Sequence, residues 1–179
     1  TGRKAIVKDF RAGWGPTVAA GAEMVIPQIQ YLTNDSWEEV SALDETNGWP
    51  MLHSASYGGG TLYVLTIPES FTDLYSLPAA VLDRIRDTLC RDLFVRLHGP
   101  AEVCLFAYDN DTFIVESFRD EPVDVQVWTK SQTTALTDLL GGQAVPARPL
   151  PQSPWQRVSG SMFEVTLPPH SYRVFQPQR

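Results

Sequence analysis

The stretch that decides the fold reads His53-Ser-Ala-Ser-Tyr-Gly-Gly-Gly-Thr-Leu-Tyr-Val-Leu-Thr-Ile-Pro68. Three consecutive glycines predict a tight turn, because glycine reaches positive φ without a Cβ clash. Residues 51–56 are expected to be extended before this turn. Residues 61–67 after it are β-branched or apolar on both faces, which predicts a strand that is covered on both sides. The glycine turn therefore joins two strands.

The clearest helix pattern follows at residues 78–93. Pro78 fits the first helical turn, where its missing N–H is not needed. Apolar residues share one helical face and charged residues take the other: Val81, Leu82, Ile85, Leu89 and Leu93 against Asp83, Arg84, Arg86, Asp87 and Arg91. We expect one long amphipathic helix that packs on the sheet containing residues 61–67.

The segment before the glycine turn is mixed. Residues 5–10 predict a short strand, residues 11–22 a glycine-rich loop, and residues 24–32 an extended segment. Asp35 or Ser36 can cap a short helix whose first turn holds two glutamates. With the helix of residues 78–93, these elements predict a partial α/β layer over residues 1–97.

The pattern changes from helical to strand-like at His98-Gly99-Pro100, and we place a module boundary there. Residues 102–108 and 112–118 predict two strands joined by a hairpin turn at Asp109-Asn110-Asp111. Alternating apolar residues predict further strands: Val123, Val125 and Val127, then Phe163, Val165 and Leu167, then residues 171–176. We expect a small antiparallel β-sandwich over residues 98–179, and an α+β class for the whole chain.

The composition is that of a folded protein, with 43% apolar and 20% charged residues. The formal net charge of −7 opposes binding to nucleic acid or to anionic membranes. No apolar run approaches the roughly 20 residues that cross a bilayer, and no signal peptide is recognisable. These features favour a soluble protein with a cytoplasmic location. The chain begins with Thr1 rather than Met, and we expect it to be cut from a longer protein.

Two parts of the chain resemble known families. Residues 57–67, with the helix of residues 78–93, resemble the end of the glutamine-amidotransferase-like domains that accompany the catalytic barrels of some bacterial glycoside hydrolases. Residues 136–142 and 163–175 resemble the C-terminal β-sandwich of multidomain glycosidases. The resemblance implies the C-terminal end of a large bacterial carbohydrate-active protein. Its catalytic carboxylates would lie in the barrel, so none is carried onto this chain.

The nucleophile candidates fit no catalytic pattern. The resemblance implies a cysteine in a Gly-x-Cys-x-Gly elbow, but neither Cys90 nor Cys104 has that context, and both are predicted to be small buried apolar groups. Ser56 has Gly58 after it but Ser54 at the matching position before it, and a strand follows, which disfavours a serine elbow.

Metal and carboxylate sites are equally unsupported. The histidines share no metal-ligand spacing, and no cofactor is predicted: they are His53, His98 and His170. A hairpin turn explains Asp109-Asn110-Asp111 without calcium. Four carboxylates are candidates for the pair that glycoside hydrolysis needs: Asp9, Asp73, Glu116 and Glu164. The sequence alone does not place any two of them at the roughly 5–10 Å that such a pair requires.

Tryptophans are the remaining lead, because aromatic faces stack on sugars. All five lie near turns or on a polar strand face: Trp14, Trp37, Trp49, Trp128 and Trp155. Trp128 continues the outward register of Asp124 and Gln126 and, with Trp49 and Trp155, forms the candidate ligand-binding set. Cover for the join between the modules, or contact with a missing domain, explains Trp128 as well.

We therefore expect a non-catalytic C-terminal region of a larger, glycoside-hydrolase-like bacterial protein, which braces the catalytic domain or mediates oligomer contacts. A carbohydrate-binding module is the alternative, and an independent hydrolase is a remote one. The expected partners are the missing N-terminal domains of the same chain, and also carbohydrate or a second copy. Nucleic acid and membranes are not expected partners.

Overall fold

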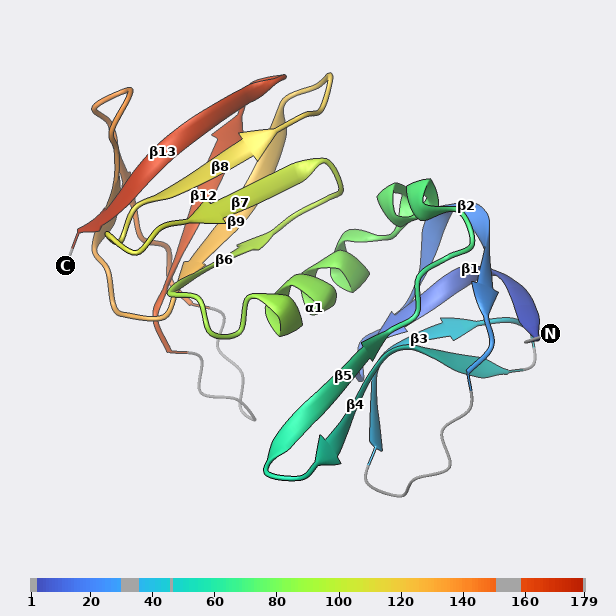
Figure 1. Cartoon of the computed structure of the whole chain (residues 1–179). Coiled ribbons are helices and arrows are strands. Elements are labelled where there is room, and N and C mark those ends of the chain that lie inside the picture. Colours follow the sequence, from blue (N-terminus) through green and yellow to red (C-terminus); the bar gives the residue numbers. More distant parts are fainter. Residues whose placement is uncertain (1–2, 30–35, 46, 151–158, 179) are drawn as a thin grey trace. The chain divides into compact units, whose positions relative to one another are not determined.

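The computed structural model describes residues 3–29, 36–45, 47–150 and 159–178. Of these residues, 55% lie in strands and 11% in helices. The chain divides into two compact units, Thr1–Ile85 and Arg86–Arg179. Figure 1 draws the first unit in blue to green and the second in light green to red. The assignment of residues 1–97 and 98–179 to two domains stays a prediction.

The first unit is built on one five-stranded antiparallel sheet with the order β2-β1-β3-β4-β5. Its strands are β1 (Lys4–Ala12), β2 (Thr17–Pro27), β3 (Ser36–Leu43), β4 (Gly48–Tyr57) and β5 (Gly60–Leu65). A 3₁₀ helix, η1 (Phe71–Ser76), and helix α1 (Ala79–Leu89) follow. Leu77, Val81 and Ile85 belong to the same buried cluster as Phe10 and Met51, so this segment closes the core on one face of the sheet.

The predicted α+β class is wrong, because the described residues are mostly strand and contain only two short helices. The predicted partial α/β layer is wrong as well, because every strand pair described in this sheet is antiparallel. The predicted long helix is also wrong: α1 has 11 residues, and Val95 already belongs to a strand. Residues 36–43 form β3 instead of a helix, since pairing with β1 and β4 on both sides overrides the local capping signal. Residues 17–22, predicted as loop, belong to β2.

The glycine turn forms as expected, with Gly58 at a φ of +57°, and it joins β4 to β5. The prediction that residues 61–67 are covered on both sides is wrong. Residues Pro50–Ser54 of β4 are buried, whereas the first four residues of β5 are exposed. The reason is position, because β5 is the edge strand and β4 lies inside the sheet.

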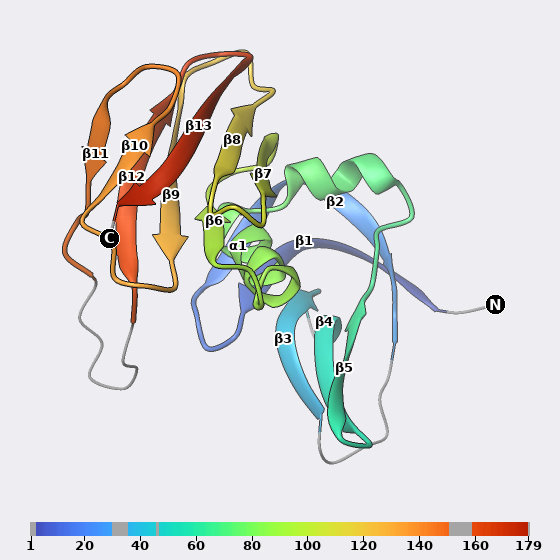
Figure 2. The ribbon, with the colours of Figure 1, turned by 60° about the vertical axis from the view of Figure 1, so that its left-hand side comes forward.

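The second unit has two antiparallel sheets, one with the order β11-β10-β13-β8-β7 and one with the order β12-β9-β6. Figure 2 shows these two groups of strands from a second direction. The strands are β6 (Val95–His98), β7 (Val103–Ala107), β8 (Phe113–Ser117), β9 (Val123–Thr129), β10 (Ala135–Asp138), β11 (Ala144–Pro146), β12 (Ser161–Leu167) and β13 (Ser171–Gln178).

Inward side chains of both sheets form one buried cluster. It includes Val127 of β9 and Phe163 of β12 from one sheet, and Phe113 of β8, Leu136 of β10 and Phe175 of β13 from the other. The Phe113 and Phe175 rings lie 5.5 Å apart between centroids. Two sheets that share one core make a small antiparallel β-sandwich. Among the residues described, neither helix is long and apolar enough to cross a membrane.

Candidate functional site

An open groove lies on the outer face of the three-stranded sheet in the second unit. Its volume is about 480 Å³, which falls within the range of small-ligand sites. The residues that line this β9–β12 groove are Asp124, Val125 and Gln126 of β9, Glu164 and Thr166 of β12, and Arg148.

Strand register brings the polar side chains of the groove together. Glu164 pairs with Gln126, and Thr166 pairs with Asp124, across the antiparallel strands β12 and β9. In both strands these residues are exposed while their neighbours are buried. Because alternate side chains of a strand point to the same face, all four line one surface.

Two contacts hold the carboxylates of the groove in place. Thr166 Oγ1 donates a hydrogen bond to Asp124 Oδ1 at 2.5 Å. Arg148 Nε donates to Glu164 Oε2 at 3.0 Å, and both of these side chains are 56% exposed. A carboxylate accepts more than one hydrogen bond, so the groove keeps capacity for hydroxyl and amide donors of a ligand.

Trp128 occupies the next outward position on β9 after Gln126, as its spacing predicts. It is half-buried rather than freely exposed, and its ring lies 5.7 Å from the His98 ring between centroids. Its indole N–H is buried and has no hydrogen-bond partner among the described residues. Sugar binding by Trp128 stays a prediction.

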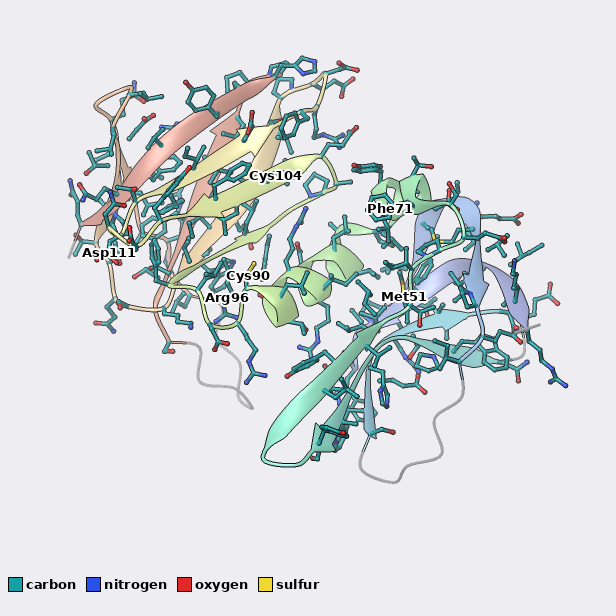
Figure 3. All side chains as sticks on the ribbon, viewed as in Figure 1. Met51, Phe71, Cys90, Arg96, Cys104 and Asp111 are labelled. Atoms are coloured by element: carbon teal, nitrogen blue, oxygen red, sulfur yellow. The ribbon has the colours of Figure 1, made fainter. Side chains whose placement is uncertain are left out.

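His98 and Arg96 of β6 contact Asp87 near the end of α1. His98 Nε2 lies 2.9 Å from Asp87 Oδ1, and Arg96 NH1 lies 3.4 Å from the same oxygen. Burial acts to raise the pKa of Asp87, but the hydrogen bond and charge of His98, together with those of Arg96, outweigh it and lower that pKa. This cluster ties the last turn of α1 to β6 within the second unit. Figure 3 labels Arg96 and nearby Cys90.

The other candidate tryptophans do not join Trp128. Trp49 of β4 belongs to the first unit, packs partly buried against its core, and donates its indole N–H to Asp44 Oδ2 at 3.2 Å. Trp14 and Trp37 also belong to the first unit and are exposed. Trp155 lies outside the described residues.

The four candidate carboxylates are spread over different elements. Asp9 lies on β1 and Asp73 in η1, both in the first unit. Glu116 lies on β8 of the five-stranded sheet, opposite Cys104, whereas Glu164 lies in the β9–β12 groove. The carboxylate that does share a surface with Glu164 is Asp124. Sequence alternation placed Asp124 outward, but the strand register that pairs it beside Glu164 is not readable from the sequence.

The two thiols and Ser56 lack the surroundings of activated nucleophiles. Cys90 and Cys104 are half-buried free thiols, and desolvation by burial raises the pKa of each. A raised pKa lowers the thiolate fraction at neutral pH, which opposes nucleophilic attack. Ser56 is exposed on β4, and the turn after it leads into another strand rather than a helix.

No cluster of three metal-ligating side chains occurs among the described residues. His53 is buried in β4 of the first unit, and His170 pairs with Asp120 at 2.8 Å. The Asp109–Asp111 segment forms the β7–β8 turn, where Asn110 Oδ1 accepts hydrogen bonds from the N–H and hydroxyl of Thr112. Figure 3 labels Asp111 in this turn and Cys104 on β7.

The outer face of the five-stranded sheet carries apolar side chains over β7, β8 and β13, with Glu116 among them. Phe106 of β7, Ile114 of β8 and Val174 of β13 lie side by side in register. The next row holds Cys104, Glu116 and Tyr172. We call the set Phe106, Ile114, Phe118, Tyr172 and Val174 the outer apolar face. Phe106, Phe118 and Tyr172 are 45%, 51% and 55% exposed.

Comparison with known proteins finds one similarity, and it lies in the second unit. A family model described as "Probable glycosyl hydrolase, C-terminal domain" matches residues 94–177, which is just under half of the chain. No curated protein and no solved structure matched the chain. The family match confirms the resemblance drawn from the tail of the sequence. The β-sandwich unit is thus similar to the C-terminal domain of probable glycosyl hydrolases.

Proposed function

We propose that the chain is a non-catalytic accessory region of a glycoside-hydrolase-like protein, and that its second unit contacts a neighbouring domain of that protein. The observation that carries the proposal is the outer apolar face. Three large aromatic side chains there are about half exposed. Phe106 and Tyr172 occupy strand positions where an isolated domain normally carries polar residues, and Phe118 directly follows β8. Aromatic side chains of this kind are enriched in the cores of protein interfaces.

The chemistry of the described residues supports the non-catalytic part of the proposal. The pKa of both thiols is raised, and Ser56 lies between two strands. The carboxylates of the groove are engaged by Thr166 and Arg148. A raised thiol pKa, and a turn after Ser56 that leads into a strand, both disfavour nucleophilic catalysis by these side chains.

A neighbouring domain is a better occupant of the outer apolar face than a second copy. The family itself is described as a C-terminal domain, and such a domain has other domains beside it. The net charge of −7 opposes association of two identical chains. We therefore assign the face to another domain of the parent protein.

The test begins with the gene upstream of Thr1. The part of the protein encoded there is produced separately, and its affinity for this chain is measured by isothermal titration calorimetry. The proposal predicts binding that weakens at least about tenfold in the double variant Phe106→Ser/Tyr172→Ser, since buried aromatic residues dominate interface energies. Tyr57→Ser removes a 76%-exposed aromatic from the first unit as a matched control.

Three results would contradict the proposal. The first is a start codon directly before Thr1, with no preceding domain. The second is binding that the double variant leaves unchanged. The third is sedimentation of the chain alone as a dimer that the double variant dissociates, because the face would then belong to a second copy. Hydrolysis of any glycoside by the purified chain would refute its non-catalytic part.

A further inference from the structure

We infer that the β9–β12 groove binds a neutral oligosaccharide. This inference goes beyond the proposed contact function and does not depend on it. The groove lies on the three-stranded sheet, and the outer apolar face lies on the five-stranded sheet. An experiment can therefore refute either proposal without refuting the other.

The first argument is the hydrogen-bonding character of the lining. Asp124 and Glu164 accept hydrogen bonds, Arg148 donates them, and Gln126 and Thr166 do both. A sugar hydroxyl both donates and accepts, so a mixed set on one surface matches a polyhydroxylated ligand. An apolar ligand fits poorly, because the one apolar lining residue, Val125, is only 3% exposed.

The second argument is charge. Two carboxylates and one guanidinium give the lining a net negative charge, and the whole chain carries −7. This potential repels phosphorylated ligands and uronic acids. The lining also lacks a third carboxylate with which to enclose a cation. A neutral ligand remains.

The third argument is preorganisation. The lining residues of β9 and β12 stand in a fixed antiparallel register, and two hydrogen bonds restrain the carboxylates before any ligand arrives. The fixed strand register means that the backbone of the site needs no ordering on binding. Alternate side chains on each strand are roughly 7 Å apart, so the polar groups follow the strand direction as successive contacts for an extended chain.

Trp128 marks where a longer ligand would continue. It occupies the outward position on β9 directly after Gln126, and the same row of β12 holds Met162. A saccharide that extends past Gln126 along the strand therefore reaches the indole ring, where stacking adds contact area.

The test uses the intact chain and named probes. Maltohexaose, cellohexaose, xylohexaose and galactotetraose represent neutral oligosaccharides, and trigalacturonate represents an anionic one. Binding is followed by amide chemical-shift changes in nitrogen-15-labelled protein. We expect at least one neutral probe to bind with a millimolar or lower Kd. The shifts should concentrate on β9 and β12.

Variants assign the binding to the groove. Gln126→Ala and Thr166→Val should each weaken the affinity about 3- to 10-fold, the effect of losing one hydrogen bond. Gln176→Ala is the matched control, because it removes an exposed glutamine from β13 of the other sheet. Thermal unfolding of each variant verifies that the fold is retained.

Each remaining outcome overturns the inference. The first is that none of the neutral probes binds at up to about 10 mM. The second is that only trigalacturonate binds. The third is that Gln176→Ala weakens the affinity as much as Gln126→Ala and Thr166→Val do. Because Phe106→Ser/Tyr172→Ser should leave saccharide binding unchanged, failure of this site is distinguishable from failure of the proposed domain contact.

Discussion

Asp138 offers the sharpest test of how the second unit is stabilised. Its side chain is 8% exposed and lies at the end of β10. Oδ1 accepts hydrogen bonds from the backbone N–H groups of Leu140 and Gly141 at 3.0 and 3.1 Å. Oδ2 accepts one from Arg173 Nε at 2.9 Å. One carboxylate thereby links the turn after β10 to strand β13.

Replacing Asp138 by Ala removes all three bonds and leaves Arg173, itself only 21% exposed, without this partner. Hydrogen bonds to charged groups contribute about 1.5–3 kcal/mol each. Water reaches the exposed Leu140 and Gly141 and restores part of that energy. We therefore expect the free energy of unfolding to fall by about 3 kcal/mol, which lowers the Tm by about 6–12 °C for a cooperatively unfolding chain of this size.

The assay is thermal and urea unfolding followed by circular dichroism. Asp120→Ala is the matched control, since its carboxylate also forms an ion pair, with His170 at 2.8 Å, but its side chain is 95% exposed. An exposed pair contributes about 0.2–1 kcal/mol. The reasoning is refuted if Asp138→Ala destabilises the chain no more than Asp120→Ala does.

Three further predictions follow from local geometry. Gly160→Ala should lower the free energy of unfolding by more than about 2 kcal/mol, since its φ is +101° and a Cβ would lie 1.8 Å from the Thr129 carbonyl oxygen; an unchanged urea midpoint would contradict this. Arg86→Ala should cost about 2–3 kcal/mol in the same measurement, because its guanidinium donates to backbone carbonyls within residues 99–103, and a loss below about 0.5 kcal/mol would oppose that role. Burial acts to raise the pKa of Asp138, but hydrogen bonds from Gly141, Arg173 and Leu140 and the charge of Arg173 lower that pKa overall. The stabilisation that Asp138 contributes is therefore present above the unfolded pKa of about 3.9 and is lost as pH falls through the lower folded pKa. The acid branch of the stability curve should therefore be shallower in Asp138→Asn, and identical branches would contradict the assignment.

The sequence predicts the second unit well because its patterns are local. The alternation of Val123, Val125 and Val127 reports one buried face, and the structure buries all three. The Asp109–Asp111 turn likewise depends on its own residues, with Asp111 at a φ of +63°. The first unit shows the opposite case. Residues 36–43 carry helix-capping signals, yet two flanking strands draw them into β3.

The sequence predicts only the β9 side of the groove. Alternation placed Asp124 and Gln126 on an outward face, but strand pairing with Glu164 depends on register between segments nearly 40 residues apart. The sequence does not predict that Arg148 lies in the groove, because Arg148 is placed there by an isolated bridge to Met162 that leaves no periodic pattern in the sequence. The outer apolar face was missed for the same reason, since it arises from three strands in register.

The central claim is that a neighbouring domain covers the outer apolar face. Hydroxyl-radical footprinting of Phe106 and Tyr172 measures this directly, by comparing the isolated chain with the full protein that contains it. The account predicts that both side chains are modified readily in the isolated chain and at least severalfold more slowly in the full protein. Equal modification in the two proteins would contradict it.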